Sequence, residues 1–181
     1  ALERVGLGGQ PEDAARLDDH PGLLQSMDGF PALVSDPWLN GRLTALHACS
    51  DLWACGAGVS SAMATVTLPM VPGNEQRELL VQTLAGIRSV LDEQGAELVG
   101  GHTMESRSSS PMPTSLGVQI TLTVNGNSSA PPWLKSGLRI GDALLISRPL
   151  GTGVLFAGAM TGASKAADLD AALRGMARSQ H

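Results

Sequence analysis

The stretch from Leu116 to Val124 constrains the fold of this chain more than any other, because apolar and polar residues alternate along it. The apolar positions are Leu116, Val118, Ile120, Leu122 and Val124. A period of two places these side chains on one face of a β-strand and the polar ones between them on the other. Half-buried strands of this kind are typical of antiparallel sheets, so we expect a sheet with one covered face.

Two segments carry helical signals and are expected to pack on the sheet. Asp36 followed by Pro37 is typical of an N-cap and a first helical residue, and this helix should run to about Ala54. Asn74 is expected to cap a second helix, which ends at Gly95. The second helix has one apolar stripe, formed by Leu80, Leu84, Ile87 and Leu91.

Shorter elements complete the predicted fold. We expect strands at 23–27 with a continuation at 30–34, at 62–68, at 96–99 and at 143–147. A glycine-rich turn at 149–153 should open a helix, and 166–178 should be helical. The predicted fold class is therefore α+β, a mixed or antiparallel sheet with helices packed on one face. Residues 1–139 are expected to form one domain, and residues 140–181 the beginning of a second, truncated one.

The charge balance argues against two classes of partner. The 181 residues have a formal net charge of −5 and a sequence pI of about 5.2. Binding to nucleic acids or anionic membranes needs a basic patch, so we expect neither partner. Cys49 and Cys55, the two cysteines, lie in one predicted helix and point in different directions. We therefore expect no disulfide and a reducing, cytoplasmic setting.

Three aspartates are candidate metal ligands. Asp13, Asp28 and Asp51 lie at the edges of predicted strands or inside an apolar helix. A carboxylate in apolar surroundings is costly unless a cation or hydrogen bonds compensate it. Mg²⁺ takes oxygen ligands, usually one or two carboxylates together with phosphate oxygens and water. The alternative is that Asp13 is a loop acid, Asp28 a turn former and Asp51 an ordinary polar residue of a helix.

A glycine pair follows a predicted strand and is expected to form a turn at Gly100, Gly101, His102 and Thr103. Two glycines let backbone N–H groups approach an anion closely, and the threonine hydroxyl adds a donor. This pattern favours a phosphate site. A plain tight turn is the alternative, with His102 packing against the protein.

A polar stripe of Thr44, His47 and Asp51 runs along the first predicted helix at spacings of three and four. Such a stripe in an apolar helix needs solvent or a ligand. A histidine beside an aspartate can perform acid–base chemistry, but we interpret His47 as a hydrogen-bonded lining residue.

These motifs together resemble the selenophosphate synthetase (selenide, water dikinase) family, whose members belong to the AIR-synthetase-like group of ATP-binding proteins. The longest match is DPWLNGRLTALHACSDLWACGA at 36–57, which is similar to the family pattern DPxxxGRIAxxxALSDLYAMGA. The resemblance extends over nearly the whole chain. Further matches are ELVGGHT at 97–103, Gly141-Asp142, RPLGTGVL at 148–155 and, more weakly, EDAA at 12–15 and QSMD at 25–28.

The resemblance implies an ATP-dependent phosphotransferase that makes selenophosphate from selenide, ATP and water, with release of AMP and phosphate. It implies a homodimer in which the sheets of two copies form a barrel. By the same resemblance, the Mg²⁺ ligands would be Asp13, Asp28 and Asp51. The residues along the ATP phosphates would be Ser26, Gly100, Gly101, His102 and Thr103.

The chain also departs from the family pattern. The family's catalytic cysteine (or selenocysteine) and lysine lie in a glycine-rich loop upstream of the first acid, and no such loop precedes Asp13. We therefore expect no catalytic nucleophile in this chain, which would be an inactive piece of a longer protein. Residues 27–29, Met-Asp-Gly, replace the usual Thr-Asp-Phe.

Two alternative functions remain open. The first is a thiamine-monophosphate-kinase-like ATP enzyme, although that family typically has Gly-Gly-Asp-Thr where this chain has Gly-Gly-His-Thr at 100–103. The second is a non-catalytic folding and dimerisation module.

Overall fold

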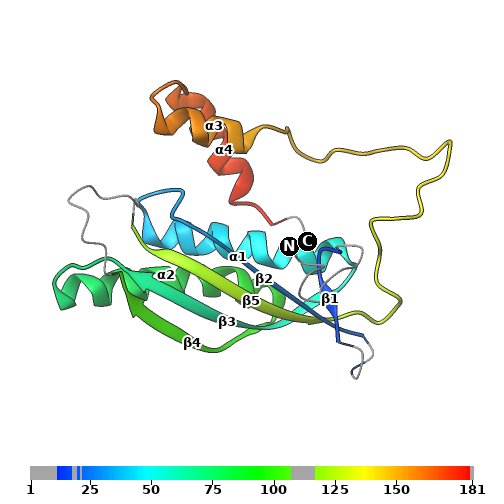
Figure 1. Ribbon diagram of the computed structural model, residues 1–181, viewed down its shortest axis with the longest axis horizontal. Helices are drawn as coiled ribbons and strands as arrows, with labels where there is room; N and C mark the ends of the chain where they lie inside the picture. Colours follow the sequence, from blue (N-terminus) through cyan, green and yellow to red (C-terminus); the bar gives the residue numbers. More distant parts are fainter. Residues whose placement is uncertain (1–11, 18–19, 21, 107–116, 180–181) are drawn as a thin grey trace, which may run out of the picture.

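The computed structural model describes residues 12–17, 20, 22–106 and 117–179, and this part of the chain contains one five-stranded sheet and four helices (Figure 1). In chain order the elements are β1 (Ala15–Arg16), β2 (Leu23–Phe30), α1 (Pro37–Ala54), β3 (Gly58–Leu68), α2 (Gly73–Gln94), β4 (Glu97–Glu105), β5 (Gln119–Asn127), α3 (Thr152–Met160) and α4 (Ala166–Met176). The α+β class is confirmed, with α1 and α2 on one face of a mixed sheet.

The sheet has the strand order β1-β2-β5-β3-β4. β5 pairs antiparallel with both β2 and β3, as the alternation around Ile120 predicts. β3 and β4 are parallel, because α2 carries the chain back between them. β2 and β4 are therefore separated by three strand spacings, roughly 14 Å.

The core lies between the sheet and the two helices that cover it. Large apolar side chains from α1, α2, β3 and β5 are fully buried there: Leu52, Val66, Ile87, Leu91, Ile120, Leu122 and Val124. Burying each such side chain stabilises the fold by about 1.5–3 kcal/mol. This layer fixes α1 over β2, where the candidate site lies.

Two glycines bring α1 and α2 into direct backbone contact. A Cβ atom on Gly41 would overlap the carbonyl oxygen of Thr83, and one on Gly86 would overlap the carbonyl oxygen of Trp38. No side chain fits at either position, so the two helices cross at the closest separation that their backbones allow.

The predicted start of α1 is confirmed, whereas that of α2 is wrong in one detail. Asp36 accepts a 2.8 Å hydrogen bond from the backbone N–H of Leu39, and Pro37 is the first helical residue. Asn74 does not cap α2, which begins at Gly73, and no side chain of the described residues caps it. Gly95 ends α2 in the left-handed conformation that favours glycine, with φ of +66°.

An extended segment, 128–151, joins the sheet to the hairpin of α3 and α4 (Figure 1). The strand predicted at 143–147 is not formed in the structure, and Leu145 within it is 93% exposed. A strand needs a neighbour for its backbone groups, and none of the described strands lies beside this segment. The helices predicted after 149–153 and at 166–178 are confirmed as α3 and α4.

The second face of the sheet is covered by none of the described helices (Figure 1). Met27 on β2 and Met63 on β3 are exposed there, 70% and 50% respectively, among partly exposed threonines. We refer to this surface as the open face. Among the described helices, none has the length and apolar character needed to cross a membrane.

Candidate acidic site between β2 and α1

Three side chains of β2 point toward α1, because alternate residues of a strand share a face. Leu24 and Ser26 are buried, and Asp28 is partly buried. Ser26 Oγ donates a 2.6 Å hydrogen bond to Oδ2 of Asp51 on α1. Ser26 therefore binds Asp51 in this structure, whereas the sequence suggested that it contacts phosphate.

Asp28 is paired with a histidine of α1. The distance between Asp28 Oδ2 and His47 Nε2 is 2.9 Å, and the His47 ring packs edge-on against Phe30 with centroids 5.3 Å apart. Asp28 Oδ1 also accepts a 2.8 Å bond from the N–H of Gly29. The polar stripe on α1 is thus compensated by protein groups, since Thr44 bonds the carbonyl of its own helix.

Asp13 is held by the segment that follows β5. Lys135 Nζ lies 2.8 Å from Asp13 Oδ1, and the backbone N–H of Lys135 donates a 3.0 Å bond to Oε2 of Glu12. The same segment is fixed to the end of α1, because the N–H of Trp133 donates a 3.0 Å bond to the carbonyl of Cys55. Nothing in the sequence pattern singled out Lys135.

The three acids influence one another. Burial is the largest cause that raises the pKa of Asp51, while the Ser26 hydrogen bond lowers it and the charges of Asp28 and Asp13 raise it further. Their oxygen donors suit Mg²⁺. Within the described residues, however, no group of three or more acidic, histidine or cysteine side chains is arranged to hold a metal ion. The carboxylate oxygens of the three aspartates fit Mg²⁺, and the side chains that now bind these carboxylates would have to move before an ion could bind.

The predicted turn at 100–103 is wrong, because these residues lie inside β4. Gly101 is paired with Ala64, and a Cβ atom on it would overlap the Ala64 carbonyl oxygen. Close pairing of β4 with β3 is therefore sufficient to explain this glycine. Gly100 has more space around it: a Cβ atom on Gly100 would have Met63 Cε, at 3.8 Å, as its nearest neighbour.

His102 and Thr103 are not near the acids within one chain. His102 pairs with Thr65, whose neighbours Ala64 and Val66 are buried under the helices, so His102 belongs to the open face. A wide hollow of about 640 Å³ at the end of β4 is lined by Met70, His102, Thr103, Met104 and Glu105. Asp28 lies on the face opposite to His102 and three strand spacings away, whereas Thr103, paired with the buried Val66, belongs to the same face as Asp28.

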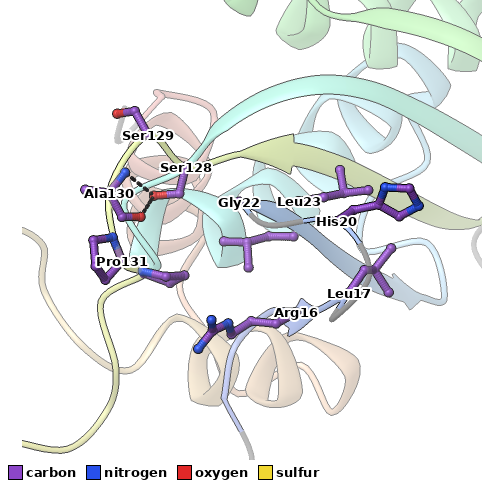
Figure 2. A pocket seen from close by; sticks show the side chains of 11 residues that line it. Arg16, Leu17, His20, Gly22, Leu23, Ser128, Ser129, Ala130 and Pro131 are labelled. Atoms are coloured by element: carbon purple, nitrogen blue, oxygen red, sulfur yellow. Dashed lines mark hydrogen bonds between the residues drawn. The ribbon is translucent and has the colours of Figure 1, made fainter.

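A separate hollow of about 410 Å³ lies beside the β1–β2 connection (Figure 2). Arg16, His20 and Ser128 line it, but the Arg16 and His20 side chains point in different directions. Ser128 Oγ bonds the Ala130 carbonyl at 2.6 Å. None of the predicted site residues lines this hollow, so it is distinct from the acidic site.

Cys49 in α1 and Cys55, which directly follows α1, have no part in the site. Cys49 and Cys55 are both free and buried, so the expectation of no disulfide between them is confirmed. Burial raises the pKa of the Cys49 thiol to about 12, and burial is also the main cause of the raised pKa of Cys55. Thiols of this kind are protonated at neutral pH and are poor nucleophiles.

The chain is similar to known proteins both in sequence and in fold. The family model for "AIR synthase related protein, N-terminal domain" matches residues 11–126. The selenide, water dikinase of Bdellovibrio bacteriovorus is 32% identical over 172 residues, which cover 94% of this chain and 46% of that protein. The enzyme of the same name from Nitratidesulfovibrio vulgaris (strain DP4) is 35% identical over 156 residues, covering 84% and 42%. This chain thus spans less than half the length of these relatives.

A solved structure has the same fold. Thiamine-monophosphate kinase from Stenotrophomonas maltophilia K279a superimposes with a TM-score of 0.64 over 93% of this chain and 56% of that one, at 17% identity. The similarity establishes the AIR-synthase-like fold, independently of what either protein does.

Proposed function

Because the chain belongs to the family of AIR synthase related proteins, we propose that it is the nucleotide-holding part of a selenide, water dikinase. Such an enzyme makes selenophosphate from selenide, ATP and water and releases AMP and phosphate. The names of the two relatives support this reaction, and the acidic site is the structural observation that carries it. The test is to supply selenide and Mg-ATP to the longer gene product. Selenide-dependent AMP is expected, whereas ADP formed regardless of selenide contradicts the proposal.

The proposed cofactor is Mg²⁺, held by Asp13, Asp28 and Asp51. When bound, the ion would neutralise the charge of the ATP phosphates during transfer. His47 and Lys135 hold Asp28 and Asp13 in the present arrangement, and they would release these carboxylates as the ion enters. Ser26 has a positioning role, because its hydrogen bond orients the Asp51 carboxylate.

ATP contacts by residues 100–103 are part of the proposal, and the contact by His102 requires a second copy of the chain. His102 and the acids lie on opposite faces of the sheet, so a homodimer would bring His102 of one copy to the nucleotide of the other. Met27 and Met63 give the open face the apolar surface that such an interface would bury. Sedimentation should detect a dimer, and a monomer at tens of micromolar contradicts this arrangement.

Two further assignments belong to the same proposal. We place a domain boundary near residue 139, which the extended, exposed segment after β5 supports. A cytoplasmic location is supported by the free thiols of Cys49 and Cys55. No residue of this chain is assigned as the catalytic nucleophile, so selenide-dependent AMP release by this chain alone would contradict the assignment.

A thiamine-monophosphate-kinase-like activity is the second candidate, because the fold is shared with such an enzyme. It ranks lower, since both relatives described above, at 32% and 35% identity, carry the dikinase name. Phosphorylation of thiamine monophosphate by the longer gene product would reverse this order.

A further inference from the structure

A small cavity lies between α1 and the two ends of the α3–α4 hairpin. Its volume is about 110 Å³. Leu43 and Leu46 of α1 form part of its apolar lining. Four polar side chains also line the cavity: His47, Ser50, Arg148 and Arg178. The sequence motifs gave no role to Ser50 or Arg178.

The two arginines bring like charges together at this cavity. Burial and the nearby charge of Arg178 lower the pKa of Arg148. Neither guanidinium takes part in any of the ion pairs that the described residues form. Two cations held close to each other without a counter-ion are unfavourable, and an anion between them would relieve the repulsion.

Hydrogen bonds hold the Arg148 side chain and the backbone next to Arg178. Arg148 donates a hydrogen bond to the carbonyl oxygen of Arg178. The preceding residue, Ala177, is fixed to α1 because its carbonyl accepts a 3.1 Å bond from Arg42 Nε. Arg42 is itself anchored by Glu93 on α2, with Nη1 and Oε1 3.0 Å apart. The Arg148 guanidinium is thus positioned before any ligand arrives, which reduces the entropy lost on binding.

We propose that this cavity binds a small tetrahedral oxyanion of the phosphate class. The guanidinium fork of arginine matches the oxygens of such an ion and forms charge-assisted hydrogen bonds with them. The volume exceeds the roughly 30 Å³ share of one water molecule and falls below the roughly 300 Å³ of sites for larger ligands, so a nucleoside does not fit.

The position of the cavity connects it to the acidic site. His47 lines the cavity and also pairs with Asp28, so a bound oxyanion would lie beside the proposed metal ligands. A role for this subsite in holding a phosphate product rests on the proposed function. Oxyanion binding itself rests only on the arginines and the cavity.

The test is a titration of the chain with inorganic phosphate at constant ionic strength, followed by calorimetry and by NMR of the arginine side chains. Saturable shifts are expected at Arg148 and Arg178. R148Q and R178Q should each weaken phosphate binding about tenfold, and R148K should lose less because it keeps the charge. R139Q is the matched control, since Arg139 is exposed and lies outside the cavity.

Absence of a saturable shift in the unaltered chain overturns the proposal, as does equal weakening by R139Q and R148Q. If R148Q fails to fold by circular dichroism, R178Q and R148K decide the question. Since neither ATP nor selenide is present, the phosphate result and the dikinase result can fail independently.

Discussion

Ser26 Oγ donates a 2.6 Å hydrogen bond to Asp51 Oδ2, which joins β2 to α1 in the layer that also holds Asp28. The bond favours the charged carboxylate, whereas burial disfavours it. Because the Asp51 carboxylate would lose its donor, we expect Ser26→Ala to lower the free energy of unfolding at pH 7 by about 1–2 kcal/mol.

Urea unfolding measures this effect. The exposed Ser129→Ala is the control and should change stability by less than about 0.5 kcal/mol. A loss in Ser26→Ala no larger than in the control would show that the bond contributes nothing.

The glycine pair in β4 gives a second prediction, because the two positions differ in space. Gly101→Ala should destabilise the fold by roughly 2–3 kcal/mol or more, since its Cβ would overlap the Ala64 carbonyl oxygen. Gly100→Ala should cost less than about 1 kcal/mol, because Met63 Cε at 3.8 Å leaves ordinary contact. Thermal or urea unfolding of both variants measures the two effects. Equal losses of unfolding free energy in the two variants would contradict the packing explanation for Gly101.

The buried thiol of Cys49 predicts a dependence of stability on alkaline pH. Its pKa is raised from 9.0 to about 12 in the folded chain, so the folded state favours the protonated thiol more than the unfolded state does. The contribution of this pKa difference to the free energy of unfolding is fully present below pH 9 and is lost as the pH rises from 9 toward 12. The slope of unfolding free energy against pH in this window should be smaller in Cys49→Ala; identical slopes would contradict burial of the thiol. The chain has no tyrosine to mask the effect.

Lys135 and a divalent cation compete for Asp13 in this account. Lys135→Gln should therefore raise the affinity of the chain for Mn²⁺, a paramagnetic substitute for Mg²⁺, by a few fold, because no ammonium group has to be displaced. Electron paramagnetic resonance of free Mn²⁺ measures the affinity. Lys165→Gln, a substitution of a distant exposed lysine, should leave it unchanged. A lower affinity in Lys135→Gln would mean that Lys135 supports the metal site.

Elements specified by neighbouring residues could be predicted from the sequence. The cap at Asp36 and the proline after it mark the start of α1, because both act within one helical turn. The alternation around Ile120 predicted β5 and its antiparallel pairing, since burial of one face requires that period. Asp28 and Asp51 were singled out by their apolar surroundings, and the structure brings both into the layer between β2 and α1.

Features that depend on distant segments could not be predicted. The glycine pair at 100–101 suits a turn as well as a strand, and only the pairing of Gly101 with Ala64 distinguishes them. Lys135 lies 123 positions from Glu12, and no local pattern relates the two residues. The segment 143–147 has the composition of a strand, but the described residues offer it no neighbour to pair with.

The most direct test of the central claim measures AMP formed from ATP, with and without selenide, by the longer gene product and by its Asp51→Asn variant. Asp92→Asn is the control, because Asp92 is an exposed acid on α2 that is paired with Arg88. We predict AMP formation that requires selenide, survives in the control and falls at least a hundredfold in Asp51→Asn. ADP formation independent of selenide, or full activity in Asp51→Asn, would contradict the account.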